Sequence, residues 1–306
     1  MKSILLYIFC GFILLGAFSC QTEDELMPDP AQPNLFAPKD DATDPISVMR
    51  RDFYKETGCY LLFSDTLKNT PNGTDAYGNQ LYDRELLDLT YGINSSVRWK
   101  FRFYYINGYE AQLAAAQTLK DKLLPAISPR YYPYSFLLVK DMESYAWQVE
   151  EGEEEGVWTG PYEMPYYIGV RAMAVSIDQL EDDPEGTILQ LSRELINKYL
   201  ATTDMTEFEA PGKKYYGIFN TPLYELNFDS VEDFVQQTGI LSYYYDEEYE
   251  ELSVDSKQDD INAYLNAILG QSEEDFKSEH QGEAIVLKKY DFLRNLLIQG
   301  GFKVHN

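Results

Sequence analysis

Residues 183–200 read DPEGTILQLSRELINKYL and carry the clearest helix signal of the chain. Asp183 is a favourable N-cap residue, and Pro184 suits the first helical position because its missing N–H would have no partner there. Apolar side chains recur at every third or fourth position and so share one face of a helix, at Ile188, Leu191, Leu195 and Tyr199. The stretch therefore predicts an amphipathic helix from Asp183 to about Leu200.

The segments on the two sides of this helix differ in character. Over residues 98–106, aromatic residues alternate with basic ones, which is the period of a strand. This order of strands with one helix, and then mostly helices, predicts an α+β fold: a small N-terminal mixed sheet with helices, followed by a mainly helical C-terminal half. Strands are predicted at residues 58–65, 98–106, 136–139 and 167–175, and helices at residues 110–127, 183–200, 230–237, 259–269 and 283–299.

The N-terminus has the layout of a secretory signal peptide. One lysine precedes an apolar run over residues 4–19, which is shorter than the ~20 residues that a membrane-spanning helix needs. Small residues lead into Cys20, an arrangement that resembles the lipobox read by bacterial lipoprotein signal peptidase. Residues 1–19 are therefore predicted to be a signal peptide and Cys20 the lipidation site, with an uncleaved anchor as the alternative.

Domain limits and location follow from this signal. Residues 20–44 contain four prolines among acidic residues and predict a flexible, lipidated tether. Residues 45–306 are predicted to form a single domain, with a sub-division near residues 205–215 as an alternative. The acidic residues directly after Cys20 resemble a surface-export signal of Gram-negative lipoproteins. An outer-membrane lipoprotein exposed at the cell surface is expected, and a periplasm-facing one is the alternative.

The chain is strongly acidic, with 51 Asp and Glu against 25 Lys and Arg and a net charge of −26. Such a charge disfavours nucleic acid and anionic membrane surfaces as partners. The acidic runs at residues 150–155 and 246–251 lack the ligand spacing of an EF-hand and are predicted to be solvated loops. The membrane is therefore expected as a partner only through the lipid at Cys20.

Residues that commonly carry catalysis are scarce. Once the signal is removed and Cys20 is acylated, the one thiol left is Cys59, whose apolar sequence neighbours predict a buried, unreactive side chain. The two histidines, His280 in a polar turn and His305 near the C-terminus, offer little for a Ser-His-Asp triad. The sequence also lacks a nucleophile elbow, a P-loop and a dinucleotide-binding glycine pattern, so no cofactor is expected.

Three segments resemble the zincin-like zinc-binding metallopeptidase lipoproteins, whose active-site helix carries the pattern H-E-x-x-H. The stretch TILQLSRELINKYL at residues 187–200 is similar to that helix. A second block of the family resembles GIFNTPLY at residues 217–224 followed by SVEDFVQ at residues 230–236, and its closing helix resembles AIVLKKY at residues 284–290. The resemblance covers about residues 53–304 and implies a zincin-like fold.

The resemblance implies a zinc site whose ligands are replaced in this chain. In the family, two histidines hold the metal and the glutamate after the first one polarises water. The histidine positions correspond to Arg193 and Asn197, the glutamate to Glu194, and the third ligand to Gln236. A guanidinium cannot bind zinc, and neutral amides suit zinc poorly. The resemblance therefore implies a degenerate member with a vestigial general-base position at Glu194 and no metal.

Three readings of function follow. The first is a non-catalytic metallopeptidase homologue that binds a polypeptide or other ligand in the former active-site cleft, with Glu232, Asp233 and Tyr224 as cleft residues. The second is a surface carbohydrate-binding lipoprotein that uses exposed Tyr and Trp, from tyrosine clusters at residues 131–134, 166–167 and 243–245. The third is hydrolysis by carboxylates alone.

Each of these readings has a plainer alternative. Core packing and loop contacts also explain tyrosine clusters. Arg193 and Glu194 also fit the solvated face of an ordinary amphipathic helix with no relation to metallopeptidases. The arrangement of these two residues with Asn197 and Gln236 in space separates the alternatives.

Overall fold

The computed structural model describes residues 33–90, 99–149 and 155–305. The described residues from Phe36 onward belong to one compact unit, Phe36–Asn306. The predicted signal peptide and Cys20 lie outside the described residues. In the described part of the chain, none of the helices is both long enough and apolar enough to cross a membrane. The described helices and strands all belong to the unit Phe36–Asn306.

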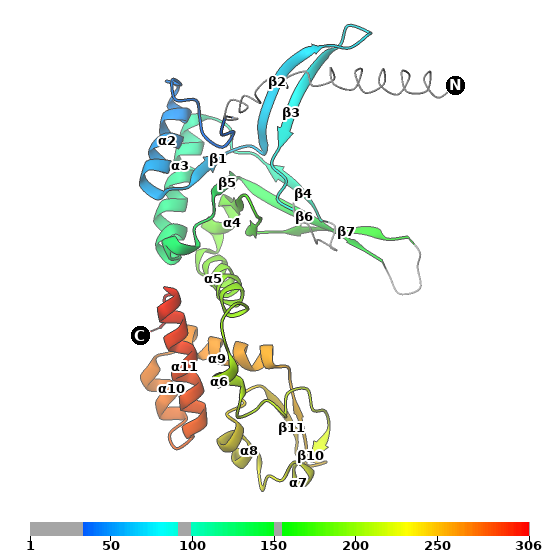
Figure 1. The fold of residues 1–306 in the computed structure, drawn as a ribbon, viewed down its shortest axis with the longest axis vertical. Helices are drawn as coiled ribbons and strands as arrows, with labels where there is room; N and C mark the ends of the chain where they lie inside the picture. The colour runs from blue at the N-terminus through cyan, green and yellow to red at the C-terminus, as the bar shows by residue number, and fades with distance from the viewer. Residues whose placement is uncertain (1–32, 91–98, 150–154, 306) are drawn as a thin grey trace, which may run out of the picture. The chain divides into compact units, whose positions relative to one another are not determined.

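A mixed four-stranded sheet forms the centre of the N-terminal half (Figure 1). Its strands β1, β5 and β9 run parallel, and β8 runs antiparallel to β9. All five residues of β5 are buried, so this strand is covered on both faces. The predicted α+β class is confirmed. In sheet order the strands are β1 (Tyr60–Leu62), β5 (Ser135–Val139), β9 (Met173–Ser176) and β8 (Tyr166–Ile168).

The prediction of a single strand at residues 167–175 is wrong, because the chain reverses there between β8 and β9. In the turn, the Gly169 N–H donates to the Ala172 carbonyl oxygen over 3.0 Å. A side chain at Gly169 would meet the Leu89 carbonyl oxygen at 2.6 Å, so the close approach of these segments needs a glycine. An apolar run on both sides of the turn conceals the reversal in the sequence.

Two helices pack beside this sheet. Helix α2 begins where the Asp44 carboxylate accepts a hydrogen bond from the Ser47 N–H over 2.9 Å, and it ends at Gly58 with φ +76°. Helix α3 continues into a π turn and then a 3-10 turn, and these pieces fill the predicted helix at residues 110–127. The bounds are α2 (Pro45–Thr57), α3 (Tyr109–Thr118), η1 (Leu119–Leu123), η2 (Leu124–Ala126) and η3 (Pro129–Tyr131).

Two antiparallel sheets complete the N-terminal half. The pair β2 and β3 is almost wholly exposed, whereas β4 and β6 each turn alternate residues inward. A strand pair without a buried face has no apolar alternation, which is why β2 and β3 could not be predicted. The strands are β2 (Thr66–Thr74), β3 (Gln80–Leu86), β4 (Trp99–Tyr104), β6 (Asp141–Gln148) and β7 (Val157–Glu163).

Helix α5 (Pro184–Leu200) follows the short helix α4 (Ile177–Asp182) and contributes to two hydrophobic cores. Its start is confirmed, because the Asp183 carboxylate accepts a hydrogen bond from the Gly186 N–H over 3.0 Å. Leu191 and Leu195 belong to the core of the N-terminal half, and Ile196 and Leu200 to the core of the C-terminal half. Of the predicted apolar face, Ile188, Leu191 and Leu195 lie at the first of these cores and Tyr199 packs against the second.

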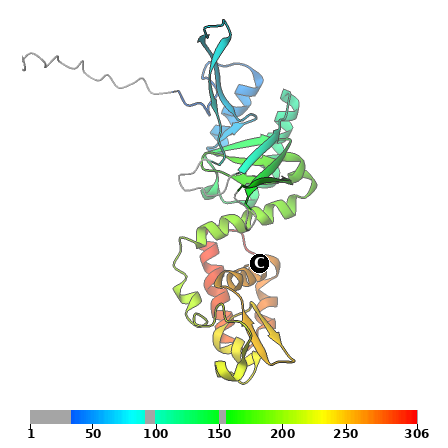
Figure 2. The same ribbon diagram turned by 90° about the vertical axis from the view of Figure 1, so that its right-hand side faces the viewer.

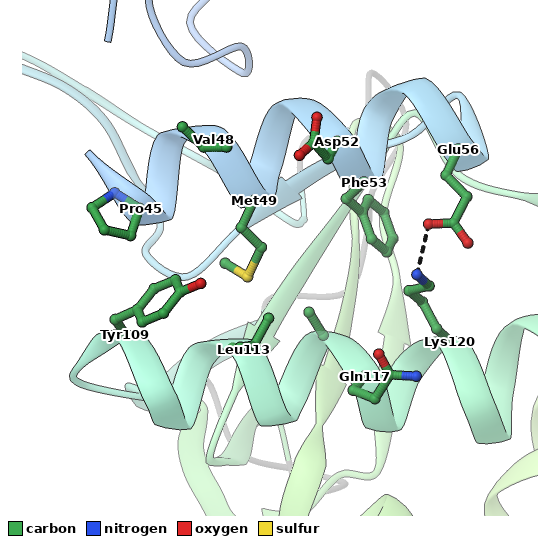
Figure 3. A pocket seen from close by; sticks show the side chains of 11 residues that line it. Pro45, Val48, Met49, Asp52, Phe53, Glu56, Tyr109, Leu113, Gln117 and Lys120 are labelled. Carbon is green, nitrogen blue, oxygen red and sulfur yellow. Dashed lines mark hydrogen bonds and ion pairs between the residues drawn. The ribbon is translucent and has the colours of Figure 1, made fainter. Parts of the chain in front are cut away.

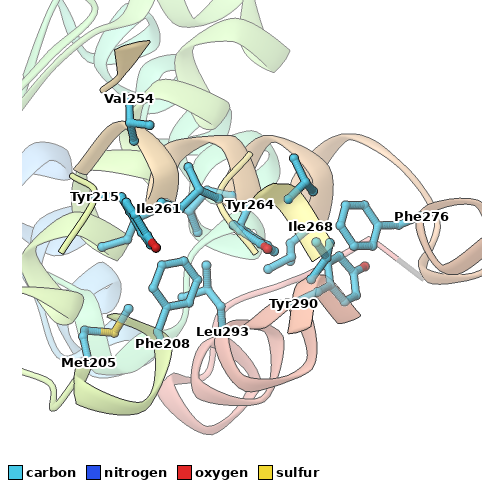
Figure 4. Packing of buried hydrophobic residues seen from close by; sticks show 14 of the residues in the cluster. Met205, Phe208, Tyr215, Val254, Ile261, Tyr264, Ile268, Phe276, Tyr290 and Leu293 are labelled. Carbon is cyan, nitrogen blue, oxygen red and sulfur yellow. The ribbon is translucent and has the colours of Figure 1, made fainter. Parts of the chain in front are cut away.

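The C-terminal half contains several helices and a small sheet (Figure 2). Its core is rich in aromatic rings (Figure 4). Phe276 stacks on Tyr290 with centroids 4.2 Å apart, and Phe208 meets Tyr264 edge-on at 5.2 Å. The predicted helices at residues 230–237, 259–269 and 283–299 are confirmed, and a small sheet of order β10-β12-β11 is added. The bounds are α6 (Thr206–Glu209), β10 (Thr221–Pro222), α7 (Leu223–Leu226), α8 (Val231–Thr238), β11 (Tyr243–Asp246), β12 (Glu251–Val254), α9 (Lys257–Gly270), α10 (Glu273–Glu279) and α11 (Ala284–Gly300).

Candidate functional site

The three positions implied as former zinc ligands make no contact with one another through hydrogen bonds or ion pairs in the described structure. Arg193 is half-buried on α5, while Asn197 one turn later is exposed and accepts a hydrogen bond from the Gln258 amide over 3.3 Å. Gln236 is exposed on α8. None of the three lines a described cavity. Their common origin in a metal site stays a prediction.

Glu194, the implied vestige of a general base, is half-exposed and forms an ion pair with Lys198 over 2.9 Å. Burial raises the pKa of Tyr166, and the nearby Glu194 carboxylate raises it further. Arg193, Asn197 and Gln236 offer a cation and two amides, which do not fit zinc. Within the described ranges, no three His, Cys, Asp or Glu side chains lie close enough to hold a metal ion.

Cys59 and His280, which the sequence predicts to be structural, each lie among structural contacts. Cys59 is 2% exposed, and burial raises the pKa of its thiol, which confirms the prediction of a buried thiol. His280 follows α10 and its Nδ1 lies 2.7 Å from the Glu283 carboxylate, while its ring packs on Phe276 at 4.3 Å. The predicted polar turn at His280 is confirmed.

Two of the cavities with mainly apolar walls adjoin the N-terminal core. One, of about 450 Å³, lies between α2 and α3 over Met49, Phe53 and Leu113, with an ion pair of Glu56 and Lys120 at one end (Figure 3). The other, of about 360 Å³, lies between α5 and the segment that contains η2 and η3. Neither brings together groups with a defined chemical task.

A third cavity, of about 600 Å³, gathers tyrosines and carboxylates, and we call it the acidic tyrosine cleft. Helix α7, the loop into α8, strand β11 and the β11–β12 turn form its walls. Two of the three predicted cleft residues, Tyr224 and Glu232, line it. The full lining is Leu223, Tyr224, Phe228, Asp229, Ser230, Val231, Glu232, Tyr243, Tyr245, Glu247 and Glu250.

Asp233, the third predicted cleft residue, does not line the cleft but holds the loop that does. Ser230 is the N-cap of α8, and its hydroxyl accepts a hydrogen bond from the Asp233 N–H over 3.2 Å. The Asp233 carboxylate in turn accepts one from the Asp229 N–H over 3.3 Å. These two bonds fix the loop that carries Asp229 and Glu232 into the cleft.

The opposite wall is the β11–β12 hairpin. Tyr243 pairs with Val254 and Tyr245 with Leu252, so both tyrosines point to one side of the strand. The turn is closed by the Asp246 carboxylate, which accepts a hydrogen bond from the Glu248 N–H over 2.9 Å. The predicted solvated loop at residues 246–251 is confirmed for residues 247–250, which are exposed, whereas Asp246 and Glu251 are half-buried ends of β11 and β12.

The charge in the cleft is uncompensated. Four carboxylates line it and no Lys, Arg or His does. None of the ion pairs formed in the described part of the chain includes them: Asp229, Glu232, Glu247 and Glu250. A hydrogen bond with its own backbone N–H, and a second with Ser230, hold the pKa of Glu232 below its usual value. Burial, then the charges of Glu232 and Glu283, raises the pKa of Tyr243.

Some tyrosines stabilise the fold, and others are exposed at the surface. The Tyr131 and Tyr132 hydroxyls donate to the backbone carbonyls of Gly300 and Leu124, so these tyrosines tie loops to the core. In contrast, Tyr224 is 73% exposed at the cleft. The sequence shows the tyrosine run and the acidic run beside it, but not that α7 and α8 face them.

No protein-family model, curated protein or solved structure matches the chain. The geometry of the cleft is therefore the basis for assigning a function.

Proposed function

We propose that this chain is a lipid-anchored, non-catalytic protein of the cell envelope that binds a basic segment of a polypeptide in the acidic tyrosine cleft. The observation that carries the proposal is the set of four lining carboxylates without a cationic partner, placed among three tyrosines. Carboxylates of like charge around one cavity repel each other, and a ligand cation relieves that repulsion.

The tyrosines suit an organic cation. A guanidinium or ammonium group over a tyrosine face gains about 0.5–1 kcal/mol at an exposed site. Tyr224 offers an exposed ring, and Tyr243 and Tyr245 stand on the opposite wall. The absence of a close metal-holding group among the described residues favours an extended, many-atom ligand over a single ion.

The anchor is the second part of the proposal. The apolar run that ends at Cys20 and the acidic residues after it support acylation and display at the outer surface of the outer membrane. Replacing Cys20 with Ala is expected to abolish lipid labelling and release the protein. Lipid labelling that persists in this variant would contradict the anchor.

A relation to zincin-like metallopeptidases is the third part, supported by the three similar segments. If the relation holds, α5 corresponds to the zinc-binding helix of that family. The combined change Arg193→His, Asn197→His and Gln236→Glu tests it. A gain of stoichiometric zinc, by elemental analysis, would support a shared ancestral site. Unchanged metal content in a folded triple variant would argue against it.

A glycan is the competing ligand, because further aromatic rings of this half are exposed. Phe219 is 77% exposed, and Tyr244 and Tyr249 are each 65% exposed. Flat exposed rings suit sugar faces. A neutral glycan would bind with little dependence on salt, whereas a basic peptide loses affinity as salt screens the carboxylates.

The test is fluorescence anisotropy with a labelled Arg-Gly repeat peptide and a Glu-Gly repeat peptide as the matched probe. The wild-type protein is expected to bind only the first. The variant Glu232→Gln, Glu247→Gln, Glu250→Gln should weaken binding on the order of tenfold or more, which is about 1.4 kcal/mol. A control variant changes three exposed glutamates outside the cleft: Glu110→Gln, Glu185→Gln and Glu274→Gln. Equal losses in both variants, or binding to a glycan array alone, would overturn the peptide proposal.

A further inference from the structure

An ion pair is fully buried in the core of the C-terminal half. The Lys289 ammonium lies 2.6 Å from Asp260 Oδ2, and the two side chains are 1% and 0% exposed. Around the ammonium, the ring centroids of Phe208 and Tyr264, both drawn in Figure 4, lie at 4.2 Å and 5.1 Å. Two charges are thus held in an aromatic environment that would otherwise be apolar.

Such a pair needs a reason other than stability. Removing two charges from water costs about as much as their attraction returns, so well-packed apolar residues are often as stabilising. Burial lowers the pKa of Lys289, as this cost requires, and Asp260 opposes the shift. The pair therefore points to a task of the Asp260 carboxylate that an apolar side chain cannot perform.

That task lies in the backbone. Besides Lys289, the Asp260 carboxylate accepts hydrogen bonds from the Tyr216 hydroxyl over 2.8 Å and from the Leu241 N–H over 2.8 Å. Leu241 stands two residues before β11. One turn after Asp260 on the same helix, the Tyr264 hydroxyl donates to the Gly239 carbonyl oxygen over 2.7 Å. Helix α9 therefore holds both ends of the short link at residues 239–241.

This link joins the two walls of the acidic tyrosine cleft. Helix α8, which begins beside Glu232, ends at Thr238, and β11 brings Tyr243 and Tyr245 to the opposite wall. A shift of the link would move one wall relative to the other. The bond from the Leu241 N–H to Asp260 is the link's polar contact nearest to β11.

We infer that Asp260 is a positioning residue of the cleft, which holds β11 through the Leu241 N–H, and that Lys289 is its buried counter-ion. The part of the inference that concerns ligand affinity rests on the proposed function. The part that concerns the backbone of β11 does not.

The test compares two variants that differ only at residue 260. Both carry Lys289→Met and Tyr216→Phe, which remove the counter-ion and the hydroxyl that would lose its acceptor. One adds Asp260→Asn, which keeps an oxygen to accept from the Leu241 N–H, and the other adds Asp260→Leu, which keeps the volume but not the acceptor. Thermal unfolding checks that both variants fold.

Amide hydrogen exchange of residues 243–246 and affinity for the Arg-Gly repeat peptide are then measured. With Asp260→Leu, exchange in β11 is expected to rise on the order of tenfold and peptide affinity to fall, at a melting temperature close to that of the Asp260→Asn variant. With Asp260→Asn both stay near wild type. Equal exchange in β11 for the two variants, or a change confined to the Leu241 amide, would overturn the inference.

The outcomes separate this inference from the proposed function. If the wild-type protein does not bind the peptide, the proposed function fails, and β11 exchange still decides the role of Asp260. If the peptide binds equally to the Asn and Leu variants while β11 exchange differs, the strand is held by Asp260 but its position does not control the cleft, and the inference is overturned for the ligand.

Discussion

The N-terminal and C-terminal halves of the unit Phe36–Asn306 differ in the polar groups that they bury. In the N-terminal half, the fully buried polar side chains of the sheet region are serines, Ser135, Ser144 and Ser176. In the C-terminal half they include an ion pair, Asp260 and Lys289. The Ser135 and Ser176 hydroxyls donate to nearby backbone carbonyls, whereas the Asp260 carboxylate, with Lys289 as counter-ion, accepts from the Leu241 N–H. The comparison suggests that the N-terminal core serves packing and that the C-terminal core also positions a surface site.

The largest expected effect comes from breaking the ion pair on one side. Lys289→Met leaves the Asp260 carboxylate buried and uncompensated, so the free energy of unfolding should fall by about 3–5 kcal/mol. Urea denaturation measures the loss. Adding Asp260→Asn should recover most of it, because the second change removes the unpaired charge. If Lys289→Met alone were as stable as wild type, the Asp260 carboxylate would have to be accessible to water.

The next effect belongs to the N-terminal core, where no charge is involved. Leu138 is fully buried in β5, and Leu138→Ala should lower the free energy of unfolding by about 3 kcal/mol through lost burial and the cavity left behind. Leu138→Met, which nearly conserves volume, should cost less than about 1.5 kcal/mol. If both variants lost the same free energy of unfolding, the volume of the side chain at residue 138 would not determine the stability of this core.

Local signals explain which parts of the fold could be predicted. Asp183 and Pro184 fix the start of α5 through bonds within one turn, and the apolar spacing of α5 reports a buried face. The exposed pair β2 and β3 gives no such signal. At residues 167–175 the error was the opposite one. Apolar residues on both sides of the turn between β8 and β9 made two strands look like one.

The candidate site was harder to predict because it is assembled from segments that are separate in sequence. Tyr224 and Glu232 were expected at a cleft through the family resemblance, whereas Tyr245, Glu247 and Glu250 were seen only as parts of a tyrosine run and an acidic run. Asp260 gave no signal at all, because its role depends on Lys289 and Leu241, which are distant in sequence.

The pH dependence of peptide binding sharpens the role of the cleft carboxylates. The pKa of Glu232 is lowered from 4.5 by a bond with its own backbone N–H and by Ser230. Its carboxylate therefore stays charged where an ordinary glutamate protonates, and arginine stays cationic throughout. Affinity for the Arg-Gly repeat peptide should fall as the pH is lowered and the cleft carboxylates protonate, and the contribution of Glu232 should be the last to be lost. In Glu232→Gln the decline should begin at higher pH, and identical profiles would remove Glu232 from the site.

A smaller effect separates the cleft from other exposed aromatic rings. Tyr224 lines the cleft, while Tyr244 is similarly exposed but does not line it. Tyr224→Ala should weaken binding of the Arg-Gly repeat peptide by about 0.5–1 kcal/mol, the size of one exposed cation–π contact. Tyr244→Ala should leave the affinity unchanged. The reverse order would move the binding surface to the outer side of β11.

The smallest expected effect concerns the polar face of α5, which the family resemblance marked as a former active site. Glu194 pairs with Lys198 across one helical turn, with both side chains about half exposed. Exposed pairs of this spacing contribute about 0.3–0.5 kcal/mol, so Glu194→Gln should change the free energy of unfolding by no more than that and leave peptide affinity intact. Denaturation and anisotropy on the same variant measure both. A strong loss of affinity with unchanged stability would instead place the ligand on α5. Glu194 does not line the cleft, and the loss of an exposed ion pair would not change the shape of the cleft. In that case the polar face of α5, and not the acidic tyrosine cleft, would be the binding surface.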